Sequence, residues 1–143
     1  MSEIEQIEDI IIGVIHDNVT GIKKCDSWPG EIGDIEEILK TPQKLPSLWV
    51  IYGGCKFGEK RVIGGNLVAL DMSFVLALVT NSLRSRKDGS RGAYELIEDI
   101  RSHMTGTILS PVRGCLWPVE EKLLLIKGGS IIYGLEYKRQ IND

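Results

Sequence analysis

The stretch SLRSRKDGSRGAYELIEDI, residues 82–100, combines a cluster of cations with serine and glycine residues. Its cations are Arg84, Arg86, Lys87 and Arg91, and a helical pattern begins directly after them. A basic, glycine-containing loop that leads into a helix N-terminus is a common way of holding phosphate. The stretch therefore raises the question of whether the chain binds a nucleotide, contacts a nucleic acid, or uses the loop in another way.

The spacing of the glycines argues against a nucleotide site. A P-loop requires the pattern G-x-x-x-x-G-K-[ST], in which backbone amides surround the phosphates and a lysine reaches them. Here Gly89 and Gly92 are three positions apart, and Gly92 is followed by Ala93 and Tyr94. No G-x-G-x-x-G pattern follows a strand either. We expect no cofactor, and a small nucleotide-binding protein that uses the 84–92 loop is the least favoured hypothesis.

The side chains that are able to act as nucleophiles or metal ligands are isolated in the sequence. Cys25, Cys55 and Cys115 have no second cysteine or histidine at metal-ligand spacing, and His16 and His103 lie far apart. No G-x-S-x-G motif occurs. We interpret the three thiols as small buried apolar side chains in a reducing compartment, and we expect no enzyme activity.

Three acids at the start of a predicted helix, Glu95, Glu98 and Asp99, first suggest acid–base catalysis or metal binding. Carboxylates in the first turns of a helix are, however, stabilised by its dipole. Arg91 with Glu95, and Glu98 with Arg101, also have the spacing of ordinary helix-surface ion pairs. We therefore expect solvated acids and no metal site here.

Sequence-specific recognition of nucleic acid is poorly supported. The sequence pI is about 5.5, whereas a DNA-binding domain usually carries a broad basic face. The aromatic residues are few, and Trp28, Trp49 and Trp117 lie beside a proline or inside an apolar run, as core anchors do. The four loop cations remain able to contact phosphates without reading bases.

The composition predicts one soluble domain over residues 1–143. Hydrophobic residues make up 43% of the 143 residues and charged residues 26%, and the mean hydropathy is close to zero. The N-terminus is acidic, whereas a signal peptide begins with basic residues, and no apolar run reaches about 18–20 residues. We expect a protein that is neither secreted through a membrane nor embedded in one.

Hydrophobic periodicity predicts two longer helices and one short helix. Apolar residues recur at helical spacing over residues 3–17, behind a capping box formed by Ser2 and Glu5. Residues 93–104 repeat the pattern and end before a glycine. A short helix is predicted over about 31–40, where a proline ends the pattern.

The remaining apolar runs predict strands. Residues 22–28 form a short extended piece, and 46–57 is a β-type run closed by two glycines. Residues 72–80 fit a strand buried on both faces, with a buried helix as the alternative. Residues 121–141 predict a β-hairpin around Gly128-Gly129. The chain is therefore expected to be an α+β domain with one mostly antiparallel or mixed sheet of four to five strands, on which two longer helices pack.

Charge is unevenly distributed along the chain. Residues 1–40 hold 10 acids and 3 bases, a net charge of −7, while residues 41–143 have a net charge of +4. One interpretation is that like charges cluster by chance on solvated faces. The alternative interpretation is that acidic and basic faces of identical subunits meet in an oligomer.

Four segments together resemble a known family. They are IEQIEDIIIGVI (4–15), SLWVIYGG (47–54), GAYELIEDIRSHMTG (92–106) and IYGLEYKRQI (132–141), and they run in order over nearly the whole chain. They look like the Mu-like phage and prophage family of small tail proteins, which is encoded beside the tail sheath and tube genes. Its members are similar to the tail-terminator, or tail-completion, proteins of contractile-tailed phages.

This resemblance implies a structural protein without catalysis. Tail terminators are α+β subunits that close into a ring, commonly a hexamer, on the finished tail tube. The ring ends polymerisation of tube and sheath and offers a docking surface for the neck proteins of the head, and DNA later passes through its centre. The implied location is the head-proximal end of the virion tail, and the host cytoplasm during assembly.

The partners implied are further copies of this chain, tail tube and sheath proteins, neck or head-completion proteins, and DNA in transit, with no membrane. Arg84, Arg86, Lys87 and Arg91 are then expected at an inter-subunit contact or facing the lumen of the ring. A neck or head–tail connector, such as a stopper or adaptor, is the alternative role within a phage particle.

Overall fold

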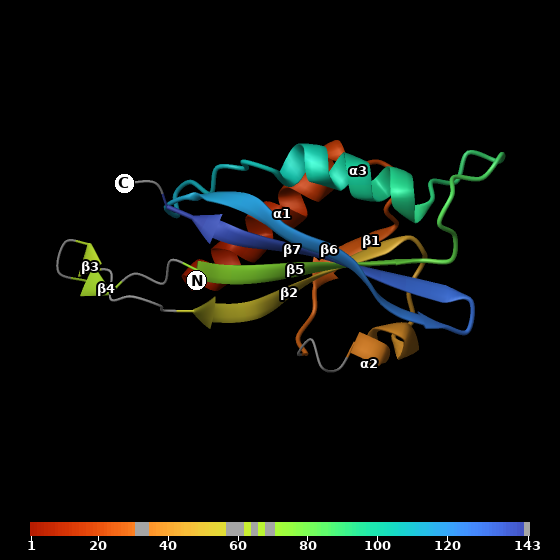
Figure 1. Cartoon of the computed structure of the whole chain (residues 1–143), viewed down its shortest axis with the longest axis horizontal. Helices are drawn as coiled ribbons and strands as arrows, with labels where there is room; N and C mark the ends of the chain where they lie inside the picture. Colours follow the sequence, from red (N-terminus) through yellow and green to blue (C-terminus); the bar gives the residue numbers. More distant parts are fainter. Residues whose placement is uncertain (31–34, 57–61, 64–65, 68–70, 142–143) are drawn as a thin grey trace.

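The main structural element is a mixed five-stranded sheet with the strand order β1-β2-β5-β7-β6 (Figure 1). The computed structural model describes residues 1–30, 35–56, 62–63, 66–67 and 71–141. β1 and β2 are parallel, and the other neighbouring pairs are antiparallel. The bounds are α1 Glu3–Asn18, β1 Lys24–Ser27, α2 Ile35–Lys40, β2 Ser47–Lys56, β5 Asp71–Thr80, α3 Ala93–Met104, β6 Cys115–Lys127 and β7 Ser130–Gln140, with β3 Val62–Ile63 and β4 Asn66–Leu67 as a separate pair. The predicted α+β class is confirmed.

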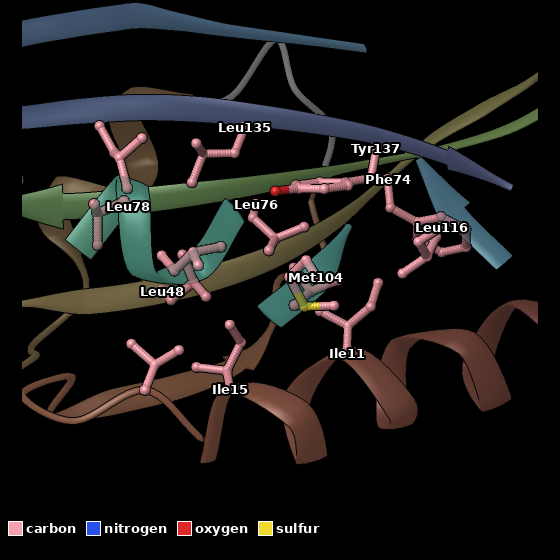
Figure 2. Packing of buried hydrophobic residues seen from close by; sticks show 14 of the residues in the cluster. Ile11, Ile15, Leu48, Phe74, Leu76, Leu78, Met104, Leu116, Leu135 and Tyr137 are labelled. Atoms are coloured by element: carbon pink, nitrogen blue, oxygen red, sulfur yellow. The ribbon is translucent and has the colours of Figure 1, made fainter. Parts of the chain in front are cut away.

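The two longer helices, α1 and α3, cover one face of the sheet, and their apolar sides form the larger core with it (Figure 2). α1 begins with the predicted capping box, because Ser2 Oγ accepts from the amide of Glu5 at 3.1 Å and Glu5 Oε1 accepts from the amide of Ser2 at 3.1 Å. Buried Arg139 of β7 forms an ion pair with Glu3, which ties the start of α1 to the sheet. The side chains labelled in Figure 2 are Ile11, Ile15, Leu48, Phe74, Leu76, Leu78, Met104, Leu116, Leu135 and Tyr137.

The second face of the sheet is covered in part by α2 and the segments around it. Ile38 of α2 packs against Trp49 and Ile51 of β2, and Trp28 meets Trp49 edge-on with 5.4 Å between ring centroids. The predicted helix over 31–40 is confirmed from Ile35 onward, and residues 31–34 lie outside the described part of the chain.

β5 occupies the middle of the sheet, and this position explains its sequence. Its side chains from Phe74 to Thr80 are all buried, because helices cover one face and α2 with its flanking segments covers the other. A strand covered on both faces has a continuous apolar run with no alternation. The strand prediction for 72–80 is confirmed, and the buried-helix alternative is wrong.

The predicted C-terminal hairpin is present but begins earlier than expected. Gly128 and Gly129 form its turn with φ values of +59° and +80°, which suit glycine at both central positions. β6 starts at Cys115, whereas 121 was predicted as the start. Its register shifts between Pro118 and Glu120 and again between Leu123 and Leu125. These bulges interrupt the period-2 pattern on which a strand prediction depends.

Candidate assembly surfaces

The loop between β5 and α3, residues 81–92, projects beyond the end of the sheet, at the upper right of Figure 1. Its base is closed by two backbone hydrogen bonds, from the amide of Ala93 to the carbonyl of Ser82 at 2.9 Å and from the amide of Tyr94 to that of Leu83 at 3.0 Å. Its tip is closed by the amide of Arg86, which donates to the carbonyl of Ser90 at 2.8 Å. The loop is therefore a folded finger with its own hydrogen bonds.

Gly92, which caps α3, is required by a close approach within this finger. A Cβ atom at this position would lie 2.3 Å from the carbonyl carbon of Arg84 and 2.5 Å from the carbonyl oxygen of Leu83. Both contacts are with backbone, which cannot move aside as a flexible side chain can. The glycine that first suggested a phosphate loop therefore allows two stretches of backbone to pack together.

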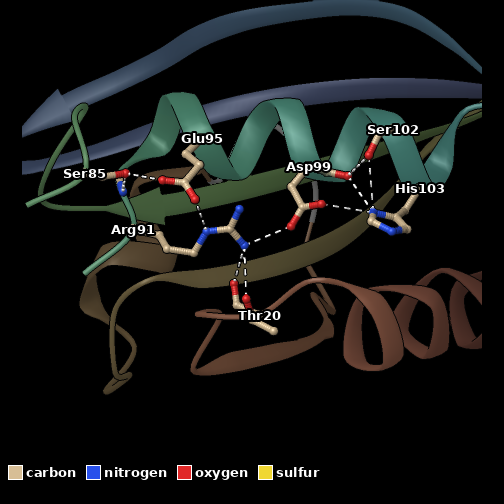
Figure 3. Close-up of polar contacts among 8 residues, drawn as sticks. Thr20, Ser85, Arg91, Glu95, Asp99, Ser102 and His103 are labelled. Atoms are coloured by element: carbon tan, nitrogen blue, oxygen red, sulfur yellow. Dashed lines mark hydrogen bonds and ion pairs between the residues drawn. The ribbon is translucent and has the colours of Figure 1, made fainter. Parts of the chain in front are cut away.

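Arg91 differs from the other three cations of the loop, because polar contacts with its own chain hold its side chain (Figure 3). Arg91 Nη1 donates to the Thr20 carbonyl and to Asp99 Oδ2, both at 2.8 Å, and Nε donates to Glu95 Oε1 at 2.9 Å. Its side chain is 18% exposed. Arg91 therefore holds the base of the finger against α3 and against Thr20, which follows α1.

These contacts also set the protonation of the cluster. Burial lowers the pKa of Arg91, but the hydrogen bonds to Asp99 and Glu95 outweigh burial and raise the pKa above its ordinary value. The hydrogen bond from Ser85 Oγ at 2.5 Å, followed by the Arg91 guanidinium, lowers the pKa of Glu95. The raised pKa of Arg91 and the lowered pKa of Glu95 both favour the charged form of this pair. The predicted Arg91–Glu95 pair is confirmed.

The three remaining cations are directed to solvent. Arg84, Arg86 and Lys87 are exposed, and none of them forms an ion pair with another residue that the structure describes. Arg86 also lines a groove of about 530 Å³ between the finger and the segments at 20–23, 45–46 and 80–82. The other charged groups lining this groove are Lys23, Asp88 and Arg91. Because Arg91 is already paired with Glu95 and Asp99, the groove carries two further cations, Arg86 and Lys23, against one acid.

A second surface, which sequence reasoning missed, lies along β6. Five of the seven exposed large apolar side chains in the described residues fall between 108 and 126. β6 is an edge strand, and the segment at 106–109 covers its outer side only at Cys115 and Leu116. We call the part from Trp117 to Lys127 the open edge. The five exposed side chains are Ile108, Trp117, Val119, Leu123 and Ile126.

The open edge is apolar on both faces of the sheet. Trp117 pairs with Lys138 on the face away from α1 and α3, while Leu123 pairs with Tyr133 on the helix face. Trp117 is 47% exposed, so its prediction as a core anchor is wrong, whereas Trp49 is buried as predicted. Apolar side chains gathered on an open strand edge are typical of a surface that meets another protein.

Only some of the ion pairs predicted for the acids of α3 are present. Arg101 bonds to Glu121 of β6, with 2.9 Å between Nε and Oε2, and the predicted pair with Glu98 is absent from the contacts of the described residues. Asp99 contacts both Arg91 and His103 Nδ1, the latter at 3.1 Å. These acids connect elements of the fold. Among the described residues, no three His, Cys, Asp or Glu side chains gather as metal ligands would.

The cysteines are half-buried, whereas the sequence predicted buried side chains. Cys25, Cys55 and Cys115 are free thiols of intermediate exposure. Burial raises the pKa of Cys25 to about 11, with a smaller contribution from Asp26. A thiol with such a pKa is protonated at neutral pH and a poor nucleophile. Within the described residues, no helix has the length and apolar content needed to cross a membrane.

A compact α+β subunit with an open apolar edge and a projecting basic finger has the features of a protein that assembles with other proteins. The chain belongs to the family described as Bacteriophage Mu, Gp37, whose model matches residues 3–121. The resemblance to Mu-like phage proteins is thereby confirmed. Membership of this family identifies a bacteriophage protein of the structural class.

No curated protein matches the chain. Among solved structures, a chain of the "Virion of native gene transfer agent (GTA) particle" is similar over 99% of this chain and 92% of its own length, with 13% sequence identity and a TM-score of 0.48.

Proposed function

We propose that the protein closes into a hexameric ring that caps the tail tube of a Mu-like phage. In this role it ends polymerisation of tube and sheath, and it presents the surface on which the neck proteins of the head dock. DNA passes through the ring when the phage ejects its genome. The subunit acts at the head-proximal end of the tail, after folding in the host cytoplasm, and it performs no catalysis.

The observation that carries this proposal is the open edge of β6. Trp117, Val119, Leu123 and Ile126 are each about half exposed, and burying the exposed part of such a side chain yields about 1 kcal/mol. The four together yield about 4 kcal/mol, whereas micromolar association requires about 8 kcal/mol. A single contact of this size leaves the free subunit soluble. Closure of a ring and binding to a tube end each add further contacts, so assembly is most favoured at the finished tail.

A ring requires two different surfaces on each subunit. A head-to-tail contact joins one patch to another and closes when the rotation allows, whereas a patch that meets its own copy stops at a dimer. The two edges of this sheet differ greatly, because β6 has 13 residues and β1 has 4. This difference supports a contact between unlike surfaces.

Deleting the gene from an inducible prophage tests the proposal. We expect tails of uncontrolled length that are not joined to heads, measured by electron microscopy of the lysate. Tails of normal length that fail to join heads would instead support the alternative role of a neck connector. Full-length virions at normal yield would contradict both roles.

A variant of the open edge makes the same experiment specific to this surface. Leu123→Asp with Ile126→Asp should fail to complement the deletion, because two carboxylates would be buried in the contact. Ser102→Asp with Ser110→Asp adds the same charge at exposed polar positions and should complement. Equal complementation by both double variants would remove the open edge from the proposal.

A further inference from the structure

We infer that the basic finger and the groove beneath it receive the acidic first turns of α1 from the next copy of this chain. The receiving side is formed by Arg84, Arg86, Lys87 and Lys23, and the entering side by Glu8 and Asp9. This inference rests on the proposed ring, and it names an electrostatic head-to-tail contact that acts beside the apolar contact of the open edge.

The finger presents its cations at a defined place. Arg91 fixes its base to Thr20 and to α3, and Gly89, with φ of +92°, turns its tip so that Arg86 and Ser90 bond to each other. The groove of about 530 Å³ below the tip adds Lys23 to the same side. A positively charged hollow with a fixed rim suits an acidic helical segment.

α1 supplies acids that are not neutralised in their own chain. Glu8 and Asp9 form no ion pair with any other residue that the structure describes, in contrast to Glu36, which pairs with Lys127, and Glu37, which pairs with Lys40. Partial burial, followed by repulsion from nearby acids of α1, raises the pKa of Glu8. A cation from outside the chain would relieve this repulsion. Charge complementarity therefore favours α1 over α2 as the partner.

The acids and the cations of one chain lie too far apart to satisfy each other. Asp9 lies nine residues before Asn18, the last residue of α1, which is about 14 Å along the helix, and Arg91 binds Thr20 beyond that end. Figure 1 places the N-terminus and the finger toward opposite ends of the main sheet. Exposed charges are screened beyond about 8 Å at physiological salt. The attraction therefore acts between copies, and its two unlike ends produce the polarity that closes a ring.

The test uses two charge-reversal variants of the full chain. The finger variant carries Arg84→Glu, Arg86→Glu and Lys87→Glu, and the helix variant carries Glu8→Lys and Asp9→Lys. Each should weaken ring formation roughly tenfold or more, measured by native mass spectrometry and by titration onto tail tubes, because like charges then face each other across the contact. Far-UV circular dichroism and thermal unfolding should be unchanged, since these side chains have no ion-pair partners within the described part of the chain.

Mixing the two variants gives the decisive result. A reversed finger then meets a reversed helix, and a native finger meets a native helix, so rings should return with the two variants alternating at a 1:1 ratio. Combining all five substitutions in one chain should also restore assembly.

Two matched controls exclude an effect of net charge. The first carries Glu37→Lys with Glu98→Lys, and the second reverses three exposed cations elsewhere, Lys44, Lys56 and Arg113, to glutamate. Both should assemble as the native chain does. Variants of finger and helix that assemble normally, or controls that fail equally, would overturn the inference and leave the ring in place.

The remaining outcomes separate other partners from a neighbouring copy. Loss of function in the finger variant alone, with weakened retention of duplex DNA on otherwise normal rings, would overturn the inference in favour of phosphate contacts in the lumen. A native chain that forms no ring at any concentration or on tail tubes would overturn the proposed function itself, and the inference with it.

Discussion

Replacing Arg91 by alanine tests whether the finger is held in place by contacts within the subunit. The side chain links residues that are 71 positions apart in the sequence, Thr20 and Arg91, and it also pairs with Asp99 and Glu95 of α3. Removing it leaves the Asp99 carboxylate, 22% exposed, without its arginine partner. We expect the substitution to destabilise the subunit and to loosen the finger.

The magnitude follows from the individual contacts. A hydrogen bond from a charged donor contributes about 1.5–3 kcal/mol when it is shielded, and this range applies to the bond with the Thr20 carbonyl, since Arg91 is only 18% exposed. The pair with Glu95 contributes little, because that acid is 51% exposed and solvent screens the interaction. Allowing for relaxation and water entry, we expect a loss of roughly 2 kcal/mol in the free energy of unfolding.

Urea unfolding, monitored by circular dichroism, measures this loss of stability. Limited trypsin digestion measures how readily the finger opens to cleavage. Arg91→Ala should lower the midpoint without changing the slope, and cleavage after Arg86 and Lys87 should become faster. Arg91→Lys should recover part of the stability, because an ammonium keeps the charge without the planar fork. Arg113→Ala, which removes an exposed cation, is the control and should stay within about 0.5 kcal/mol of the native chain.

An Arg91→Ala variant with native stability and native protease resistance would refute this account of the finger. Normal stability with faster cleavage would mean that Arg91 orders the loop and contributes nothing to the fold. Either result would also weaken the fixed geometry on which the groove depends.

Further predictions concern single sites. Gly92→Ala should cost about 2 kcal/mol or more in thermal unfolding, since its Cβ would meet backbone at 2.3 Å, whereas Gly13→Ala, with nothing within 4 Å, should be neutral or stabilising. Cys25 should react slowly with iodoacetamide at pH 8, because burial raises its pKa to about 11. The Cys25 thiol ionises near pH 9 in the unfolded chain and near pH 11 in the folded chain. Its contribution to the free energy of unfolding should therefore be complete below about pH 9 and decline as the pH rises toward 11. Nucleotides should leave the unfolding temperature unchanged, and a dose-dependent increase would revive a nucleotide site at the 84–92 loop.

Much of the fold was predictable because local signals agreed with it. The capping box of Ser2 and Glu5 marked the start of α1, and regular helical spacing followed it. The unbroken apolar run of β5 indicated a strand covered on both faces, and the glycine pair at 128–129 marked the hairpin turn. In each case the information lay within a few adjacent residues.

The open edge was not predictable for a physical reason. Val119 and Leu124 sit in bulges, so the side chains of β6 do not alternate regularly between the two faces. Pro118 also argues against a strand in the sequence, because within a sheet proline is tolerated mainly in edge strands and at bulges. Trp117 beside it resembled a core residue in sequence, and only the strand order shows that no strand of the described chain covers it.

The candidate contacts of the basic loop were only partly predictable. Arg91 and Glu95 have the i,i+4 spacing of residues that pair on a helix surface, and their ion pair forms as expected. Arg91 binds Thr20, and Arg101 binds Glu121. Each of these partners is distant in the sequence, so no local pattern predicts the contact. The sequence located the cluster of cations, and tertiary packing decided that one of them binds within the subunit while three face outward.

The mass of the assembled protein tests the central claim most directly. Native mass spectrometry of the purified chain, alone at rising concentration and released from tail tubes, reports the number of copies in each particle. We expect a closed hexamer in equilibrium with monomer, weakened by salt, and seen by negative-stain microscopy as a ring at one end of each tube. A protein that stays monomeric at every concentration and binds no tube would contradict it.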